Sequence, residues 1–145
     1  MKRILLALLL TASPCYADCY AGSTHIIKED FGGSIPDYID RYDNWKTNGD
    51  IPIIDGICAS ACAYVTRVPL ACASENGMFI FHEAYTVKHP DKSVSHQPHI
   101  YNEKIRKETF ALYPTFVQKE LLRRGGLKKT WLFIRAEDLL PECKG

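Results

Sequence analysis

Two residues in the sequence combine the side chains and the spacing of a nucleophile and its base. Ser60 follows an apolar, β-branched run, Ile51–Ile54, and opens a segment of small residues that is typical of a helix start. His82 ends a second apolar run, Met78–Phe81, 22 residues further along the chain. A serine hydroxyl becomes a strong nucleophile when a neighbouring imidazole accepts its proton. The order of strand, serine, helix, strand and histidine therefore predicts acyl-transfer chemistry if the two strands are neighbours.

Backbone N–H groups near Ser60 would support such chemistry. The first N–H groups of a helix have no intrahelical partner, and the helix dipole is positive at that end, so negative charge near Ser60 would be stabilised. A glycine pair, Gly32-Gly33, follows an expected strand and offers a second set of donors. Adjacent glycines adopt backbone angles closed to other residues and let a ligand approach the main chain. Taken alone, the pair also has the simpler interpretation of a tight turn.

The elements that would position these residues alternate between strands and helices. Apolar and β-branched runs predict strands at 24–28, 51–57, 78–81 and 131–134. Apolar periodicity predicts helices at 34–48, directly after Ser60, at 100–112 and at 114–124, with a helical turn at 136–140. The polar stretch 83–99 is expected to be a surface loop. With 145 residues, the chain is expected to form one α/β domain.

The first residues are typical of a secretory signal. Lys2-Arg3 precedes an apolar run over residues 4–10, and small residues follow up to Ala17. We expect cleavage after Ala17, which leaves a single domain at 18–145 in the periplasm or outside the cell. The apolar run is shorter than the roughly 20 residues that span a bilayer, so no stable membrane insertion is expected after cleavage.

Cysteine usage agrees with export. Five cysteines follow the signal segment: Cys19, Cys58, Cys62, Cys72 and Cys143. This number predicts disulfides, although five cysteines cannot all pair within one chain and the sequence does not give their connectivity. Cys62 with Cys72 is the preferred pair because the intervening loop is short.

Composition excludes several other classes of function. The spacing of Cys58 and Cys62 matches no metal-ligand set, and His89, His96 and His99 are expected to be solvated loop residues, so neither a metal nor a cofactor is predicted. The net charge of +1 provides no field for a nucleic acid, and none is expected as a partner.

Several short motifs follow one another along the chain: a Gly-Gly-Ser turn, CASAC, FH, RRGGL and a terminal cysteine. Together they resemble the Clp protease proteolytic subunit and the wider crotonase-like fold. The similarity is greater to small exported Clp-like proteins of bacteria, and it runs from about residue 25 to residue 136. It implies that Ser60 is the nucleophile, His82 the base, and the N–H groups of Gly33 and Ala61 the oxyanion hole. Relative to that family, the domain is expected to be truncated on its N-terminal side, so an ATP-fed proteolytic chamber is not implied.

The third member of the family's triad is not matched. The family has an aspartate shortly before its last strand, where residues 127–131 here contain no carboxylate. Glu83, Glu137 and Asp138 are the candidate orienting acids. The alternatives are a two-residue site and a site that has lost catalysis.

Three functional hypotheses follow. The first is an exported serine hydrolase that acts on peptides and forms an acyl-enzyme on Ser60. The second is a non-catalytic module that binds a peptide or small molecule between Gly33, Ser60 and His82. The third uses a thiolate at Cys58 or Cys62, which requires a free thiol. The family also implies a homo-oligomer formed through the helix at 100–112.

Overall fold

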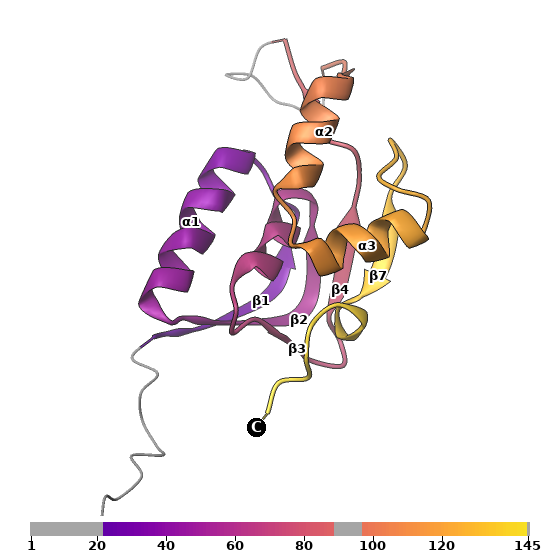
Figure 1. Cartoon of the computed structure of the whole chain (residues 1–145). Helices are drawn as coiled ribbons and strands as arrows, with labels where there is room; N and C mark the ends of the chain where they lie inside the picture. Colours follow the sequence, from indigo (N-terminus) through magenta and orange to yellow (C-terminus); the bar gives the residue numbers. More distant parts are fainter. Residues whose placement is uncertain (1–21, 89–96, 145) are drawn as a thin grey trace, which may run out of the picture.

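A mostly parallel sheet forms the centre of the molecule. The computed structural model describes residues 22–88 and 97–144. The five strands of the sheet are β1 (Thr24–Asp30), β2 (Ile51–Ala59), β3 (Cys72–Ala73), β4 (Met78–Phe81) and β7 (Leu132–Arg135). Their order is β1-β2-β4-β7 with β3 beside β2, and only β7 runs antiparallel to its neighbour (Figure 1). The expected mixed α/β architecture is therefore confirmed.

The helices cover one face of this sheet. They are α1 (Ile35–Asn48), η1 (Ser60–Arg67), α2 (Glu103–Ala111), α3 (Thr115–Arg123) and the short η3 (Ala136–Asp138). Figure 1 shows η1 and α3 in front of the strands, with α1 beside them. Successive side chains of a strand point to opposite faces, so Phe79 and Phe81 of β4 are fully buried beneath the helices.

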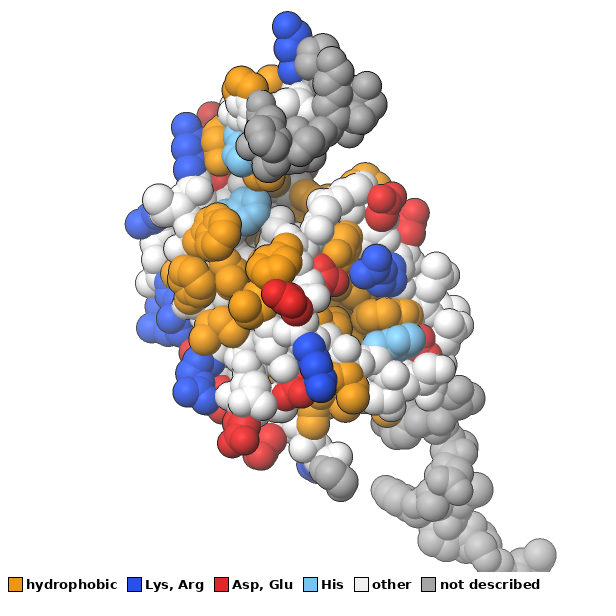
Figure 2. Space-filling view, turned by 180° about the vertical axis from the view of Figure 1, so that it is seen from behind, with side chains coloured by type: hydrophobic (Ala, Val, Ile, Leu, Met, Phe, Trp, Pro, Cys, Tyr) orange, Lys and Arg blue, Asp and Glu red, His pale blue; other side chains and the backbone are white. Residues whose placement is uncertain are grey.

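The opposite face of the sheet carries exposed apolar side chains. Ile26 of β1 is 59% exposed, and Phe133 of β7 is 54% exposed. Figure 2 shows hydrophobic side chains gathered over this face, which is seen there from behind. The main cluster of buried side chains therefore lies on the helix-covered face, although Ile80 and Ala59 on the other face are buried as well.

Local signals explain where α1 begins and ends. Pro36 lies in its first turn, where a missing N–H costs nothing. Gly49 ends the helix at φ 72°, and its N–H bonds to the carbonyls of Trp45 and Lys46. Tyr38 and Tyr42 form the buried stripe between these ends. The helix predicted over 34–48 is therefore confirmed.

Two elements differ from the sequence expectation. The segment after Ser60 forms a 3₁₀-helix, η1, whose tighter turn buries Ala61 through Thr66. The helix expected at 100–112 begins at Glu103, because the Asn102 side chain accepts the N–H groups of Lys104 and Ile105 at 2.8 and 3.3 Å. Residues ahead of this cap form β6 (Ile100–Tyr101), which pairs with β5 (Tyr85–Thr86) inside the stretch expected to be a loop.

Several sequence predictions fall on residues that the structure does not describe. The signal segment with its cleavage site, Cys19, His89 and His96 all lie outside the described residues. Within 22–88 and 97–144, no helix is both long and apolar enough to cross a membrane.

Candidate functional site

Ser60 occupies a turn with unusual backbone geometry. β2 ends at Ala59 and η1 begins at Ser60, whose φ is 57°. Among the described residues, Ser60 is the one non-glycine residue with positive φ. This conformation costs an L-residue about 1–2 kcal/mol, and such strain is concentrated at functional sites. The turn therefore presents the partly buried serine at the carboxyl edge of the sheet at an energetic cost.

Gly32 packs directly against this turn. Its φ is 80°, and a Cβ added to it would lie 2.7 Å from both the carbonyl oxygen of Ala59 and the backbone nitrogen of Ala61. The Cβ of Ser60 would be 2.8 Å from the same position. Only glycine fits at this point, because no side chain could be accommodated without moving backbone atoms. The glycine turn and the serine turn, which are far apart in sequence, are thus in contact, and the backbone of Ala61 faces the glycine turn.

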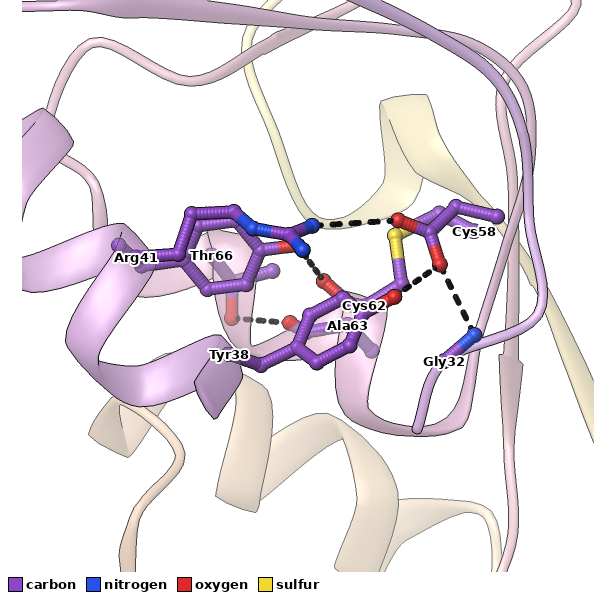
Figure 3. The surroundings of a disulfide bond; sticks show 9 residues. Gly32, Tyr38, Arg41, Cys58, Cys62, Ala63 and Thr66 are labelled. Carbon is purple, nitrogen blue, oxygen red and sulfur yellow. Dashed lines mark hydrogen bonds and ion pairs between the residues drawn. A yellow bond between two sulfur atoms is a disulfide. The ribbon is translucent and has the colours of Figure 1, made fainter. Parts of the chain in front are cut away.

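Asp30 holds the glycine turn from the end of β1. Its Oδ1 accepts the Gly32 N–H at 2.9 Å and also the hydroxyl hydrogen of Tyr38 (Figure 3). Arg41 lies 3.7 Å from its other oxygen. Burial, followed by the bond to Asp30, raises the pKa of Tyr38. This cluster was not predicted from the sequence, although an aspartate two residues before a glycine pair is a signal that could have indicated it, because an aspartate side chain often accepts the N–H two residues on.

A disulfide encloses the serine turn. Cys58 and Cys62, each two residues from Ser60, are bonded, are fully buried and have Cα atoms 5.3 Å apart (Figure 3). The hydroxyl of Tyr42 donates a 3.0 Å hydrogen bond to the carbonyl of Cys62. The end of β2 and the start of η1 are thereby joined covalently and anchored to α1. The thiol hypothesis is wrong for this oxidised form, because neither sulfur is free.

The preferred pairing of Cys62 with Cys72 is also wrong. Cys72 pairs with Ile53 in β2, whereas Cys62 lies beside Cys58, five residues later in that strand. Ile53 and Cys58 are about 17 Å apart along the strand. Cys62 and Cys72, which lie beside them, are therefore separated by far more than the ~7 Å between Cα atoms that a disulfide allows. Cys72 is bonded instead to Cys143, with Cα atoms 5.0 Å apart.

His82 leaves the sheet at the same edge as Ser60. β2 and β4 are parallel and pair Ala59 with Ile80, so the next residues of both strands emerge side by side. The Nδ1 of His82 lies 2.8 Å from the backbone carbonyl oxygen of Glu83. A carbonyl can only accept, so Nδ1 carries a hydrogen, and in the neutral imidazole Nε2 then has the free lone pair. This is the tautomer that a general base requires.

Two of the three candidate orienting acids are at the other end of β4. The antiparallel β7 pairs Arg135 with Met78, and Glu137 follows Arg135. His82 is four residues beyond Met78, about 13 Å along the strand. Glu137 is instead paired with Arg135 at 2.7 Å, and Asp138 with Arg124 at 3.1 Å.

The third candidate, Glu83, contacts the imidazole through its backbone. Across the described ranges, no carboxylate oxygen lies within hydrogen-bond distance of the His82 ring. Ser60 and His82, both described, are not hydrogen-bonded to each other in this conformation. Catalytic hydrogen bonds are often long before substrate binds. The two side chains therefore share an edge of the sheet without forming an assembled pair.

Histidine and acidic side chains elsewhere have structural partners. His25 lies 2.9 Å from Asp50 and stacks on Trp45 with ring centroids 4.1 Å apart. The bonds from His25 and from the Ser23 N–H lower the pKa of Asp50. His99 stacks on Tyr85 at 3.7 Å. No cluster of three or more His, Cys, Asp or Glu residues in the described part could hold a metal ion.

Comparison with known proteins adds no assignment. No protein-family model matches this chain, and no curated protein is significantly similar to it in sequence.

Proposed function

We propose that this protein is an exported serine hydrolase of the Clp and crotonase-like fold, acting on peptides, with Ser60 as nucleophile and His82 as base. The observation that carries the proposal is the backbone of Ser60. A serine kept at φ 57° between a strand and a helix, with Gly32 packed against it, is costly in a residue that has only a structural role. Strained turns of this kind expose nucleophilic serines at the carboxyl edge of α/β sheets.

Each residue has a defined part in the reaction. Nε2 of His82 takes the proton of the Ser60 hydroxyl as Oγ attacks the substrate carbonyl carbon. The N–H groups of Gly33 and Ala61 donate to the oxygen that becomes negative. The imidazolium then protonates the leaving group, and a water molecule activated by the same imidazole hydrolyses the acyl-enzyme. The carbonyl of Glu83 keeps the Nδ1 hydrogen in place throughout.

The disulfides and the apolar N-terminal segment support export. Both disulfides are of the kind that persists in oxidising compartments. A mature domain at 18–145 in the periplasm or outside the cell is the corresponding proposal for localisation.

Labelling with a fluorophosphonate probe tests this function. We expect the oxidised protein to be labelled, and Ser60→Ala and His82→Ala to remain unlabelled. Ser34→Ala is the matched control, because Ser34 is exposed beside the same glycine turn and its side chain caps no N–H. Circular dichroism establishes that each variant is folded. A folded parent that resists labelling, or equal labelling of Ser60→Ala, would contradict the proposal.

One observation favours the second candidate, a non-catalytic binding module. His82 is oriented by a neutral carbonyl, and a neutral group stabilises the imidazolium less well than the carboxylate of a triad does. The surface between Gly33, Ser60 and His82 could then bind a peptide without cleaving it. Peptide binding by a folded parent that the probe does not label would favour this alternative.

A further inference from the structure

A hollow of about 490 Å³ is lined by α2, by the end of α3 and by the loop that follows α3. Figure 1 shows these two helices at an angle to each other, with the loop beside them. The volume lies within the range of roughly 300–1,000 Å³ that is typical of small-molecule sites. None of the lining residues has a part in the proposed catalysis, so the hollow requires a separate explanation.

Three apolar side chains line the hollow: Phe110, Leu122 and Leu127. Phe110 is half-buried and packs against the core, and Leu127 is buried. Leu122, by contrast, is 62% exposed. An apolar ligand in the hollow would remove part of this leucine from water, which is favourable in proportion to the apolar area covered.

Two glycines keep the hollow open on the side of the loop. A Cβ added to Gly126 would meet no atom within 4 Å, so the space beside it is free. The N–H groups of Gly125 and Gly126 are already bonded to the carbonyls of Leu122 and Leu121, at 3.0 and 2.8 Å, where they cap α3. The glycines therefore contribute space to the hollow but no free N–H group.

The polar side chains around the hollow are cationic. Arg106 and Lys107 line it from α2, and the Nζ of Lys128 lies 3.4 Å from the position of a Cβ on Gly125. Glu103 is 2.8 Å from Lys107 but 3.9 Å from Arg106, which is too long for a hydrogen bond. The guanidinium of Arg106 and the ammonium of Lys128 have no side-chain hydrogen-bond partner in the described part of the chain. Three cations therefore surround the hollow with one carboxylate between them.

We propose that this hollow binds a free fatty acid in its ionised form, with the carboxylate on Arg106 and the alkyl chain against Leu122. A guanidinium matches a planar carboxylate through two parallel N–H bonds. An extended peptide fits less well, because its backbone groups need partners, and the N–H groups of both glycines and of the α2 residues are bonded within their helices and caps. The proposal does not depend on Ser60 or His82.

Isothermal titration calorimetry with dodecanoate, kept below the concentration at which it forms micelles, tests this site on the purified, oxidised protein. Dodecanol has the same chain and no charge. We expect dodecanoate to saturate one site, and dodecanol to bind about tenfold more weakly or worse, because a charge-assisted hydrogen bond is lost. A folded parent that does not bind dodecanoate would overturn the proposal, as would equal affinity for dodecanol.

Two matched pairs of variants locate the ligand. Arg106→Gln should weaken dodecanoate binding about tenfold. Arg123→Gln removes the same charge from an arginine outside the hollow, so it should leave the affinity unchanged. Leu122→Asn should also weaken binding about tenfold, whereas Phe116→Asn, at an apolar residue of α3 that is 46% exposed and does not line the hollow, should not.

The four substituted side chains are not buried, and circular dichroism establishes that each variant is folded. Equal effects within either pair would show that dodecanoate binds elsewhere on the surface, and would overturn the assignment to this hollow. Fluorophosphonate labelling of Ser60 is a separate measurement, so failure of the proposed catalysis would leave the titration result unchanged.

Discussion

Substitution of Gly32 by alanine tests whether the glycine turn supports the serine turn. The new Cβ would lie 2.7 Å from two backbone atoms, whereas ordinary contacts of such an atom begin at 3.4 Å. Neither atom belongs to a flexible side chain, so the serine turn itself must move. Overpacking of this kind costs about 1–3 kcal/mol, and the positive φ of Gly32 adds about 1–2 kcal/mol for an L-residue. We expect Gly32→Ala to lower the free energy of unfolding by about 2–5 kcal/mol.

The next residue provides the control. A Cβ on Gly33 would meet only the Tyr38 ring, at 3.5 Å, and Gly33 does not have positive φ. Alanine at this position also retains the backbone N–H, so we expect Gly33→Ala to change the free energy of unfolding by less than about 1 kcal/mol. The two substitutions have the same effect on composition and lie next to each other in the chain.

Urea denaturation followed by circular dichroism measures both variants, and fluorophosphonate labelling reports on Ser60. We expect Gly32→Ala to lose labelling where it remains folded, because displacement of Ala59 and Ala61 moves the serine between them. Equal stability of the two variants would refute the reasoning. Retention of full labelling by a destabilised Gly32→Ala would show that the contact affects the fold but not the serine.

Two further predictions concern the disulfides and a buried tyrosine. The Cys72–Cys143 bond closes a span of 71 residues and the Cys58–Cys62 bond a span of 4, so chain entropy predicts that their removal lowers the free energy of unfolding by about 4 and about 2 kcal/mol, respectively. Denaturation of the two double-alanine variants tests this order, and the reverse order would contradict it. Burial raises the pKa of Tyr64 from 10.0 to about 12, so the unfolded state loses this proton first and stability falls as pH rises from 10 to 12. Tyr64→Phe should flatten that fall in pH-dependent denaturation, and an unchanged slope would count against burial as its cause.

The sequence by itself determined the elements whose signals are local. Met78–Phe81 was predicted as a strand because a short apolar run between turns has few alternatives, and Gly49 ended α1 because only a glycine readily adopts φ 72°. Ser60 was predicted to lie between a strand and a helix because an apolar, β-branched run precedes it and small residues follow it. Periodicity and turn chemistry act over a few residues, so they can be read without knowing the fold.

Tertiary structure decided everything that depends on which elements are neighbours. Cys62 bonds to Cys58 and not to Cys72, because the parallel register places Cys72 far back along β2. Likewise, the antiparallel direction of β7 carries Glu137 away from His82, although the two strands are adjacent. Spacing in sequence cannot contain this information, because the distance between two residues depends on the direction and register of strands that pair across the chain.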